Sequence, residues 1–138
     1  MKVYFDTNVL LDVLQARQPF VVESRRVWGL AEQRRIDGLI SVLTLPNIYY
    51  VARRISDRSA ALAMVRQVRV TFGILACDEG TVDRALASDF PDFEDAIQYF
   101  CASKARVDCV LTRDAGHFAL AAVPVLSPEQ FLATYTFE

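Results

Sequence analysis

Three aspartates at separate points of the chain have the residue type and the setting to bind a divalent cation. Asp6 ends an apolar run near the N-terminus, Asp114 follows a second apolar run, and Asp95 lies in a short acidic segment between them. Carboxylates that come close together repel one another unless a cation lies among them, and a ligand set made only of oxygens suits Mg²⁺ or Mn²⁺. Such an ion activates water and polarises a phosphoryl oxygen, so these residues indicate hydrolysis of a phosphodiester.

Neutral polar residues and a set of arginines would serve the same chemistry. Thr112 and Asn8 lie beside the aspartates in the sequence, and their hydroxyl and amide groups are suited to orient the scissile phosphate or the metal-bound waters. Residues 1–70 contain ten arginines, whose guanidinium groups match phosphate oxygens. Any one of them can lie on a solvated, ion-paired helix face, but together they would hold a nucleic-acid backbone near the acidic site.

Each aspartate also has a purely structural interpretation. Asp6 and Asp114 are both suited to cap a helix that follows them. Asp92 as N-cap with Asp95 at the third helical position resembles a capping box, and acids in a first turn suit the helix dipole. Capping does not require the three acids Asp92, Glu94 and Asp95 in four positions, because added like charges repel one another. The convergence of Asp6, Asp95 and Asp114 therefore favours a metal site.

Short apolar runs alternate with helical patterns from one end of the chain to the other. The apolar runs predict strands at 2–5, 39–42, 74–77, 108–112 and 123–126. Helical spacing and capping residues predict helices over 9–16, 19–35, 44–55, 57–70, 79–87, from 92 through 105 and from 127 onward.

The predicted strands are continuously apolar, which is typical of a parallel sheet covered on both faces. We therefore expect an α/β fold, a three-layer α/β/α sandwich with a mostly parallel sheet of about five strands, as one domain over residues 1–138. Ligands of such sheets bind beyond the carboxyl ends of the strands. This rule places Asp6 and Asp114, which both follow strands, at the same edge.

Composition and charge narrow the classes of protein further. Of 138 residues, 53% are hydrophobic and 23% are charged, which excludes a disordered chain. The formal net charge of −2 excludes a generally polycationic nucleic-acid binder, but residues 1–70 hold 11 basic against 6 acidic residues and residues 71–138 hold 4 against 11. Three cysteines without metal-ligand spacing, and no apolar segment of signal-peptide or membrane-spanning length, predict a cytoplasmic protein that does not enter a membrane.

Other chemistries find less support in the sequence. His117, the single histidine, lies between Gly116 and Phe118 and is more typical of a surface or packing residue than of a base. With five glycines in all, the chain has no glycine-rich phosphate loop. A phosphoryl-transfer domain of receiver or haloacid-dehalogenase type would need an acid at position 8 or a lysine after the last core strand, and position 8 is asparagine while no lysine follows Lys104.

Three segments in the expected order resemble the PIN domain family. Val3 to Asp12 reads VYFDTNVLLD and is similar to its opening motif, DFEDA at 92–96 is similar to the central motif of the VapC-like subgroup, and VLTRD at 110–114 is similar to its closing motif. The resemblance implies a Mg²⁺- or Mn²⁺-dependent ribonuclease with the toxin role of a type II toxin–antitoxin pair, acting on RNA and silenced by a cognate antitoxin. Asp6, Asp95 and Asp114 match the metal-binding acids of the family.

The chain departs from the PIN pattern at one position. Asn47 stands where most members carry a glutamate, and an amide brings no charge. Glu94 is the candidate to supply that charge to the metal, while either Glu94 or Asp92 could replace Asp95 as the central acid. Asn47 and Arg113 are also expected to bind substrate. The alternative is a catalytically weak or inactive PIN-like module that binds RNA or protein.

The apolar content of a chain this short also predicts a partner. With 53% hydrophobic residues, some apolar surface is expected to be covered by a homodimer, by an antitoxin or by both.

Overall fold

The computed structural model describes residues 1–137 and contains one sheet of five strands in the order β3-β2-β1-β4-β5. All four pairs of neighbouring strands are parallel. The strands are β1 (Lys2–Phe5), β2 (Asp37–Ser41), β3 (Gly73–Leu75), β4 (Cys109–Leu111) and β5 (Val125–Leu126). The predicted α/β fold with a parallel five-stranded sheet is confirmed.

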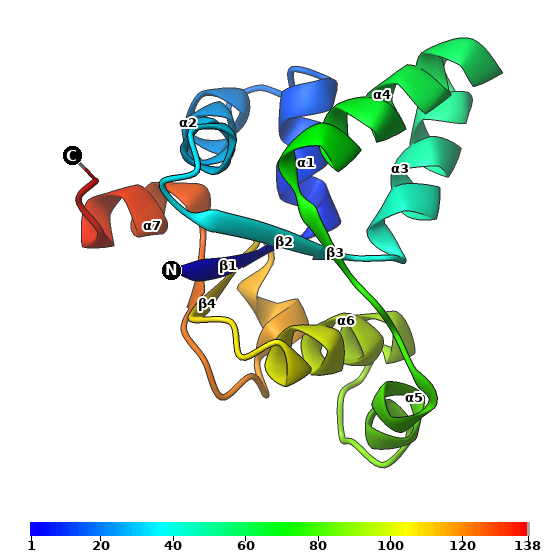
Figure 1. Ribbon diagram of the computed structural model, residues 1–138, viewed down its shortest axis with the longest axis vertical. Helices are drawn as coiled ribbons and strands as arrows, with labels where there is room; N and C mark the ends of the chain where they lie inside the picture. Colours follow the sequence, from blue (N-terminus) through cyan, green and yellow to red (C-terminus); the bar gives the residue numbers. More distant parts are fainter. Residues whose placement is uncertain (138) are drawn as a thin grey trace.

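Helices cover both faces of this sheet (Figure 1). They are α1 (Thr7–Leu14), α2 (Val21–Glu32), α3 (Thr44–Arg53), α4 (Arg58–Thr71), α5 (Glu79–Leu86), α6 (Phe93–Lys104) and α7 (Pro128–Thr134), with a short 3-10 helix η1 (Ala115–Phe118). In Figure 1, α1 to α4 lie on one side of the sheet, and α5 and α6 lie on the other. The three layers are those expected from strands that are apolar throughout.

The side chains of the central strand alternate between the two layers. Val3 and Phe5 of β1 are fully buried in the core beneath α1 to α4, whereas Tyr4 is fully buried in the core beneath α6. In the neighbouring strand β4, Leu111 belongs to the first of these cores and Val110 to the second. Because successive side chains of a strand point to opposite faces, both cores draw on the same short apolar runs.

Several element boundaries differ from the predicted ones, for identifiable reasons. Helix α1 begins at Thr7 instead of residue 9, because the Asp6 side chain accepts the Thr7 N–H and caps the helix. Helix α2 begins at Val21, two residues after the predicted start, and has no side-chain cap. It ends at Glu32, shortly before Arg34, which has a positive φ of 57°.

Within residues 1–137, no helix is both long enough and apolar enough to cross a membrane.

Gly38 lies inside β2 at a position where a side chain does not fit. A Cβ at this position would lie 2.8 Å from a ring carbon of Phe72 and 2.9 Å from the Ala31 Cβ. We expect Gly38→Val to lower the free energy of unfolding by about 1–3 kcal/mol through overpacking. Gly29→Ala is the matched control, because a Cβ at residue 29 meets nothing within 4 Å. The free energy of unfolding of both variants would be measured in urea. An equal loss in the two variants would contradict this explanation.

Candidate active site

The carboxyl ends of β1 and β4 bring Asp6 and Thr112 into contact. Phe5 and Leu111 are partners in the parallel register of the two strands, so the residues that follow them lie side by side. The Asp6 N–H donates to the Leu111 carbonyl at 2.9 Å, and the Thr112 hydroxyl donates to Asp6 Oδ2 at 2.8 Å. The predicted edge of the sheet therefore carries the predicted acid, which is only 6% exposed.

Thr112 fixes the geometry of this edge through a single hydroxyl group. Its Oγ1 lies 3.3 Å from Asn8 Nδ2 and 3.0 Å from the backbone nitrogen of Asp114, and both of these groups are donors. Because a hydroxyl has one proton and two lone pairs, the Thr112 proton is left for Asp6. One side chain thus connects β1, the start of α1 and the loop after β4.

Asp6 both caps α1 and lies in a buried position that disfavours its charged form. Its Oδ1 accepts the Thr7 N–H at 2.7 Å, so the structural interpretation of this residue is correct as far as it goes. Burial raises the pKa of Asp6 above its usual value, although the hydrogen bonds from Thr112 and Thr7 act in the opposite direction. A buried carboxylate with a raised pKa at the end of a strand is a candidate ligand for a metal ion.

The acidic segment at the start of α6 contains a capping residue and a partly buried residue. Asp92 is exposed and its Oδ1 accepts the Asp95 N–H at 3.0 Å, so it is the N-cap. The Asp95 side chain is only 14% exposed. Burial, followed by the charges of Asp92, Asp6 and Glu94, raises the pKa of Asp95 to about 6, although His117 opposes this change. Asp95 is therefore the acid of this segment whose environment most resembles that of Asp6.

His117 lies between two of the candidate ligands. Its Nε2 is 2.9 Å from Asp114 Oδ2, and its Nδ1 is 3.8 Å from Asp95 Oδ2. The side chain is 52% exposed, which agrees with the expected surface position. The sequence analysis missed the contact with the acids. The spacing of three residues between Asp114 and His117 was the available signal, because residues i and i+3 lie on the same side of a 3-10 helix.

Asn47 is in direct contact with Glu94. The Asn47 amide nitrogen, on α3, donates to Glu94 Oε1 at 2.7 Å on α6. Residue 47 is itself an amide, but the Glu94 carboxylate lies within hydrogen-bond distance of it. A role for Glu94 in binding the metal stays a prediction.

Arg113 was predicted to bind substrate, but in the structure its guanidinium group binds a carboxylate of the protein. Its Nε donates to Asp12 Oδ2 at 2.7 Å and its Nη2 donates to Asp12 Oδ1 at 3.0 Å. The guanidinium carbon lies 3.9 Å from the centre of the Phe20 ring, and the side chain is 25% exposed. Sequence reasoning did not single out Asp12, which is fully buried. Contact of Arg113 with substrate stays a prediction.

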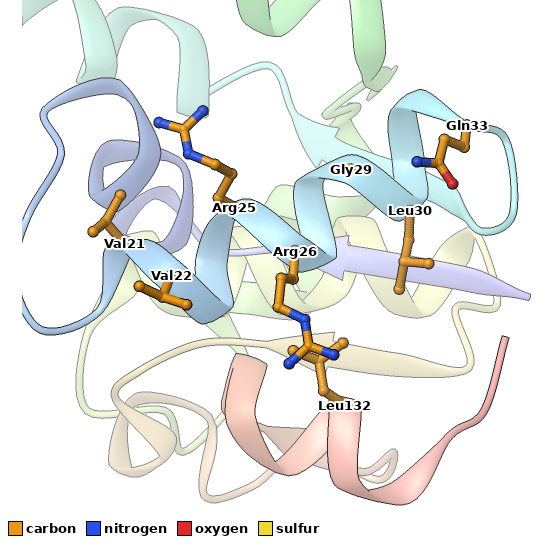
Figure 2. Close-up of a pocket in the computed structure, with 8 residues that line it drawn as sticks. All are labelled: Val21, Val22, Arg25, Arg26, Gly29, Leu30, Gln33 and Leu132. Atoms are coloured by element: carbon orange, nitrogen blue, oxygen red, sulfur yellow. The ribbon is translucent and has the colours of Figure 1, made fainter.

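The acids at the start of α6 lie at a hollow in the protein surface. Asp92, Glu94, Asp95 and His117 contribute to the lining of a hollow of about 320 Å³. A larger hollow of about 540 Å³ lies between α2 and α7, where Arg26 extends toward Leu132 (Figure 2). No carboxylate lines that second hollow, so it does not have the chemistry of a site for a cation.

The donor set at the edge of the sheet fits a hard divalent cation. Its candidate ligands Asp6, Asp95 and Asp114 offer only carboxylate oxygens, which Mg²⁺ and Mn²⁺ prefer. Burial raises the pKa values of both Asp6 and Asp95, although the charge of His117 acts in the opposite direction at each of them. In the part of the chain that the structure describes, no three acidic, histidine or cysteine side chains already form a group that could hold an ion.

Comparison with known proteins decides the family. The PIN domain family model matches residues 2–116. The chain belongs to the PIN domain family. This PIN domain is 27% identical over 135 residues to Ribonuclease VapC1 of Aquifex aeolicus, with 94% of this chain and 92% of the relative covered. The family resemblance inferred from the three motifs is confirmed.

Solved structures of similar fold agree with this membership. A toxin–antitoxin complex from Klebsiella pneumoniae matches with a TM-score of 0.69 and 23% identity over 91% of this PIN domain and 97% of the matched chain. The sarcin–ricin loop cleaving toxin VapC20 of Mycobacterium tuberculosis matches with a TM-score of 0.69 and 15% identity, over 86% and 94% of the two chains. DNA-bound VapBC from Salmonella typhimurium matches with a TM-score of 0.70 and 17% identity, over 93% and 98%. These identities are low, and the similarities establish the shared fold.

Proposed function

We propose that this PIN domain is a Mg²⁺- or Mn²⁺-dependent endoribonuclease and the toxin of a toxin–antitoxin pair. The observation that carries the proposal is the pair formed by buried Asp6 and partly buried Asp95, which lie close enough for the charge of Asp6 to contribute to the raised pKa of Asp95. A curated relative of similar length is named a ribonuclease, and several structures of the same fold are complexes of toxin and antitoxin.

Each side chain of the site has a role in this proposal. Asp6, Asp95 and Asp114 would hold the ion, which supplies activation of water and polarisation of the scissile phosphate. Thr112 holds the Asp6 carboxylate by its hydroxyl proton, and Asn8 holds Thr112.

Glu94 has a supporting role that compensates for Asn47. The 2.7 Å hydrogen bond from the Asn47 amide keeps the Glu94 carboxylate on the site side of α6. We assign Glu94 as the source of the negative charge that a glutamate at position 47 would provide. We also assign Asn47 to the binding of RNA, because its amide group has a second N–H that can donate to a phosphate oxygen.

Removal of the metal tests the proposed reaction. We expect EDTA to reduce cleavage of a fluorescently labelled RNA to background, and added Mn²⁺ or Mg²⁺ to restore it, because the three acids alone have no means to activate water. Calorimetric titration with Mn²⁺ should show binding at the same pH. Asp83→Asn, an exposed acid on α5, is the control variant and should behave like the wild type. Equal cleavage with and without EDTA would refute the metal mechanism.

A binding module without catalysis is the second candidate function. It is favoured by one observation, the neutral amide at position 47. This candidate predicts that RNA is retained in a filter-binding assay, that it stays intact, and that Mn²⁺ titration shows only weak binding. Cleavage that depends on the metal would exclude it.

We further propose that an antitoxin covers part of the apolar surface and that the toxin is a homodimer. Large apolar side chains with more than half of their surface exposed are Val22, Tyr50, Ile55, Val70, Leu86, Phe93 and Leu120. Where such side chains are contiguous on the surface, they form a patch that a partner can bury. Light scattering of the purified chain, alone and with the product of an adjacent small gene, measures both associations.

A further inference from the structure

A buried ion pair connects helix α1 to the loop that follows β4. The Asp12 side chain is 0% exposed, and Arg113 binds both of its oxygens, at 2.7 and 3.0 Å. The Ser24 hydroxyl of α2 donates to the same carboxylate at 3.1 Å. Within residues 1–137, Arg113 is the one basic side chain that forms an ion pair with Asp12.

The position of the Arg113 side chain is dictated by these contacts. A buried carboxylate is strongly unfavourable unless a cation and hydrogen-bond donors compensate it, and a guanidinium that binds both oxygens in parallel has little freedom to turn. Phe20 lies against the guanidinium, at 3.9 Å between the guanidinium carbon and the ring centre, which adds a cation–π contact. The side chain is thus held on two sides.

The backbone of Arg113 is attached to the same helix. Its N–H donates to Asn8 Oδ1 at 3.3 Å. Asn8 and Asp12 are four residues apart on α1 and therefore lie on one face of that helix, one turn from each other. Residue 113 is consequently fixed to α1 at two successive turns, once by its backbone and once by its side chain.

The neighbours of Arg113 in the chain are the two residues of this loop that serve the site. Thr112 donates to Asp6. The Asp114 N–H donates to the Thr112 hydroxyl, and the Asp114 carboxylate lies beside His117, whose side chain is about half exposed. No hydrogen bond or ion pair joins Asp114 to α1 in the described residues. The attachment of residue 113 to α1 therefore acts together with the Thr112 hydroxyl to set the position of Asp114 relative to Asp6.

We propose that Arg113 is a positioning residue, which through its ion pair with Asp12 holds Asp114 and Thr112 in place for the metal. The consequence for metal binding rests on the proposed function, whereas the ordering of the loop does not. A residue that instead only contacts RNA would leave metal affinity unchanged when replaced. The two roles of Arg113 therefore give different experimental results.

Three variants and a control test the proposal. They are Arg113→Met, Asp12→Leu, the double variant that combines them, and Arg66→Met, which replaces an exposed arginine of α4 that forms no ion pair in the described residues. For each we would measure the thermal midpoint, the hydrogen-exchange rate of the Asp114 amide, and the dissociation constant for Mn²⁺ by calorimetry.

The expected pattern separates positioning from stability. Arg113→Met should lower the thermal midpoint, speed exchange of the Asp114 amide and weaken Mn²⁺ binding by about 10- to 100-fold, the usual range for a group that orients a metal ligand. The double variant leaves no unpaired buried charge, so its thermal midpoint should recover. Its exchange rate and Mn²⁺ affinity should stay those of Arg113→Met, and Arg66→Met should match the wild type.

Two results would overturn the proposal. The first is a double variant that recovers Mn²⁺ affinity and slow exchange together with its thermal midpoint. The second is an Arg113→Met protein with unchanged exchange and Mn²⁺ affinity but a raised KM for RNA. If the wild type binds no Mn²⁺, the proposed function is wrong. The positioning role is then tested by hydrogen exchange alone, and an unchanged exchange rate of the Asp114 amide in Arg113→Met would reject it. If Arg113→Met does not fold, the double variant and Arg113→Lys give the same comparison.

Discussion

Replacement of Asp6 by asparagine is expected to lower RNA cleavage by about 10³-fold, the loss typical for a group that stabilises charge in the transition state. The carboxylate is the one charged group at the end of β1, and an amide cannot supply the anionic oxygen that Mg²⁺ or Mn²⁺ requires. Asparagine can still accept the Thr7 N–H and cap α1, because it is a good N-cap residue. The fold should therefore survive the change.

The local consequence of Asp6→Asn falls on Thr112. The second oxygen of Asp6 is replaced by an NH₂ group, which is a donor, and the Thr112 Oγ1 already receives donors from Asn8 and Asp114. The Thr112 hydroxyl then loses Asp6 Oδ2 as its acceptor and must donate its proton to another group. We expect the loop after β4 to become slightly more mobile, while the loss of a buried charge offsets part of the stability cost.

Circular dichroism, an RNA cleavage assay and Mn²⁺ calorimetry would measure this outcome on one protein sample. Asp83→Asn serves again as the control, because it makes the same chemical change at an exposed position on α5. An Asp6→Asn protein that is folded and retains more than a tenth of the wild-type rate would show that Asp6 is not a ligand of the catalytic ion.

The sequence predicted those parts of the structure that depend on local pattern. The strands at 2–5 and 108–112 are short apolar runs between helical patterns, and parallel pairing then requires that the residues after them meet at one edge. Asp6 and Thr112 do meet there. Helix caps depend on one side chain and the next few backbone groups, so Asp57, Asp78 and Ser127 are recognisable from the sequence and all three accept an N–H in the structure.

The parts that could not be predicted depend on contacts between distant residues. Asp12 and Arg113 are 101 positions apart, and nothing in the local pattern of either one names its partner. Asn47 and Glu94 are 47 positions apart, and only the folded structure shows that their side chains meet. Strand pairing and helix faces follow from periodicity, whereas the choice among polar partners follows from the tertiary structure.

Asp95→Asn is expected to stabilise the metal-free protein at neutral pH and to abolish its activity. Burial raises the pKa of Asp95 to about 6, so the folded state holds this proton more tightly than the unfolded state does. The stability that the protonated carboxyl contributes is fully present below about pH 4 and is lost as the pH rises through about 6. At pH 7.5 the folded protein carries a partly buried charge that the unfolded chain solvates freely.

The size of this effect follows from the pKa shift, reduced for solvent access. A shift of about two units corresponds to at most about 3 kcal/mol, and the partial exposure of Asp95, together with its favourable place in the first turn of α6, lowers the expected gain for Asp95→Asn to about 1–2 kcal/mol. Urea unfolding at pH 7.5 and at pH 4 in EDTA should show a gain at pH 7.5 that disappears at pH 4. Mn²⁺ should raise the stability of the wild type but not of Asp95→Asn, because bound metal stabilises only a protein that retains its ligand. An equal gain at both pH values would mean that asparagine acts through packing, and that the acid at position 95 is not kept there at the expense of stability.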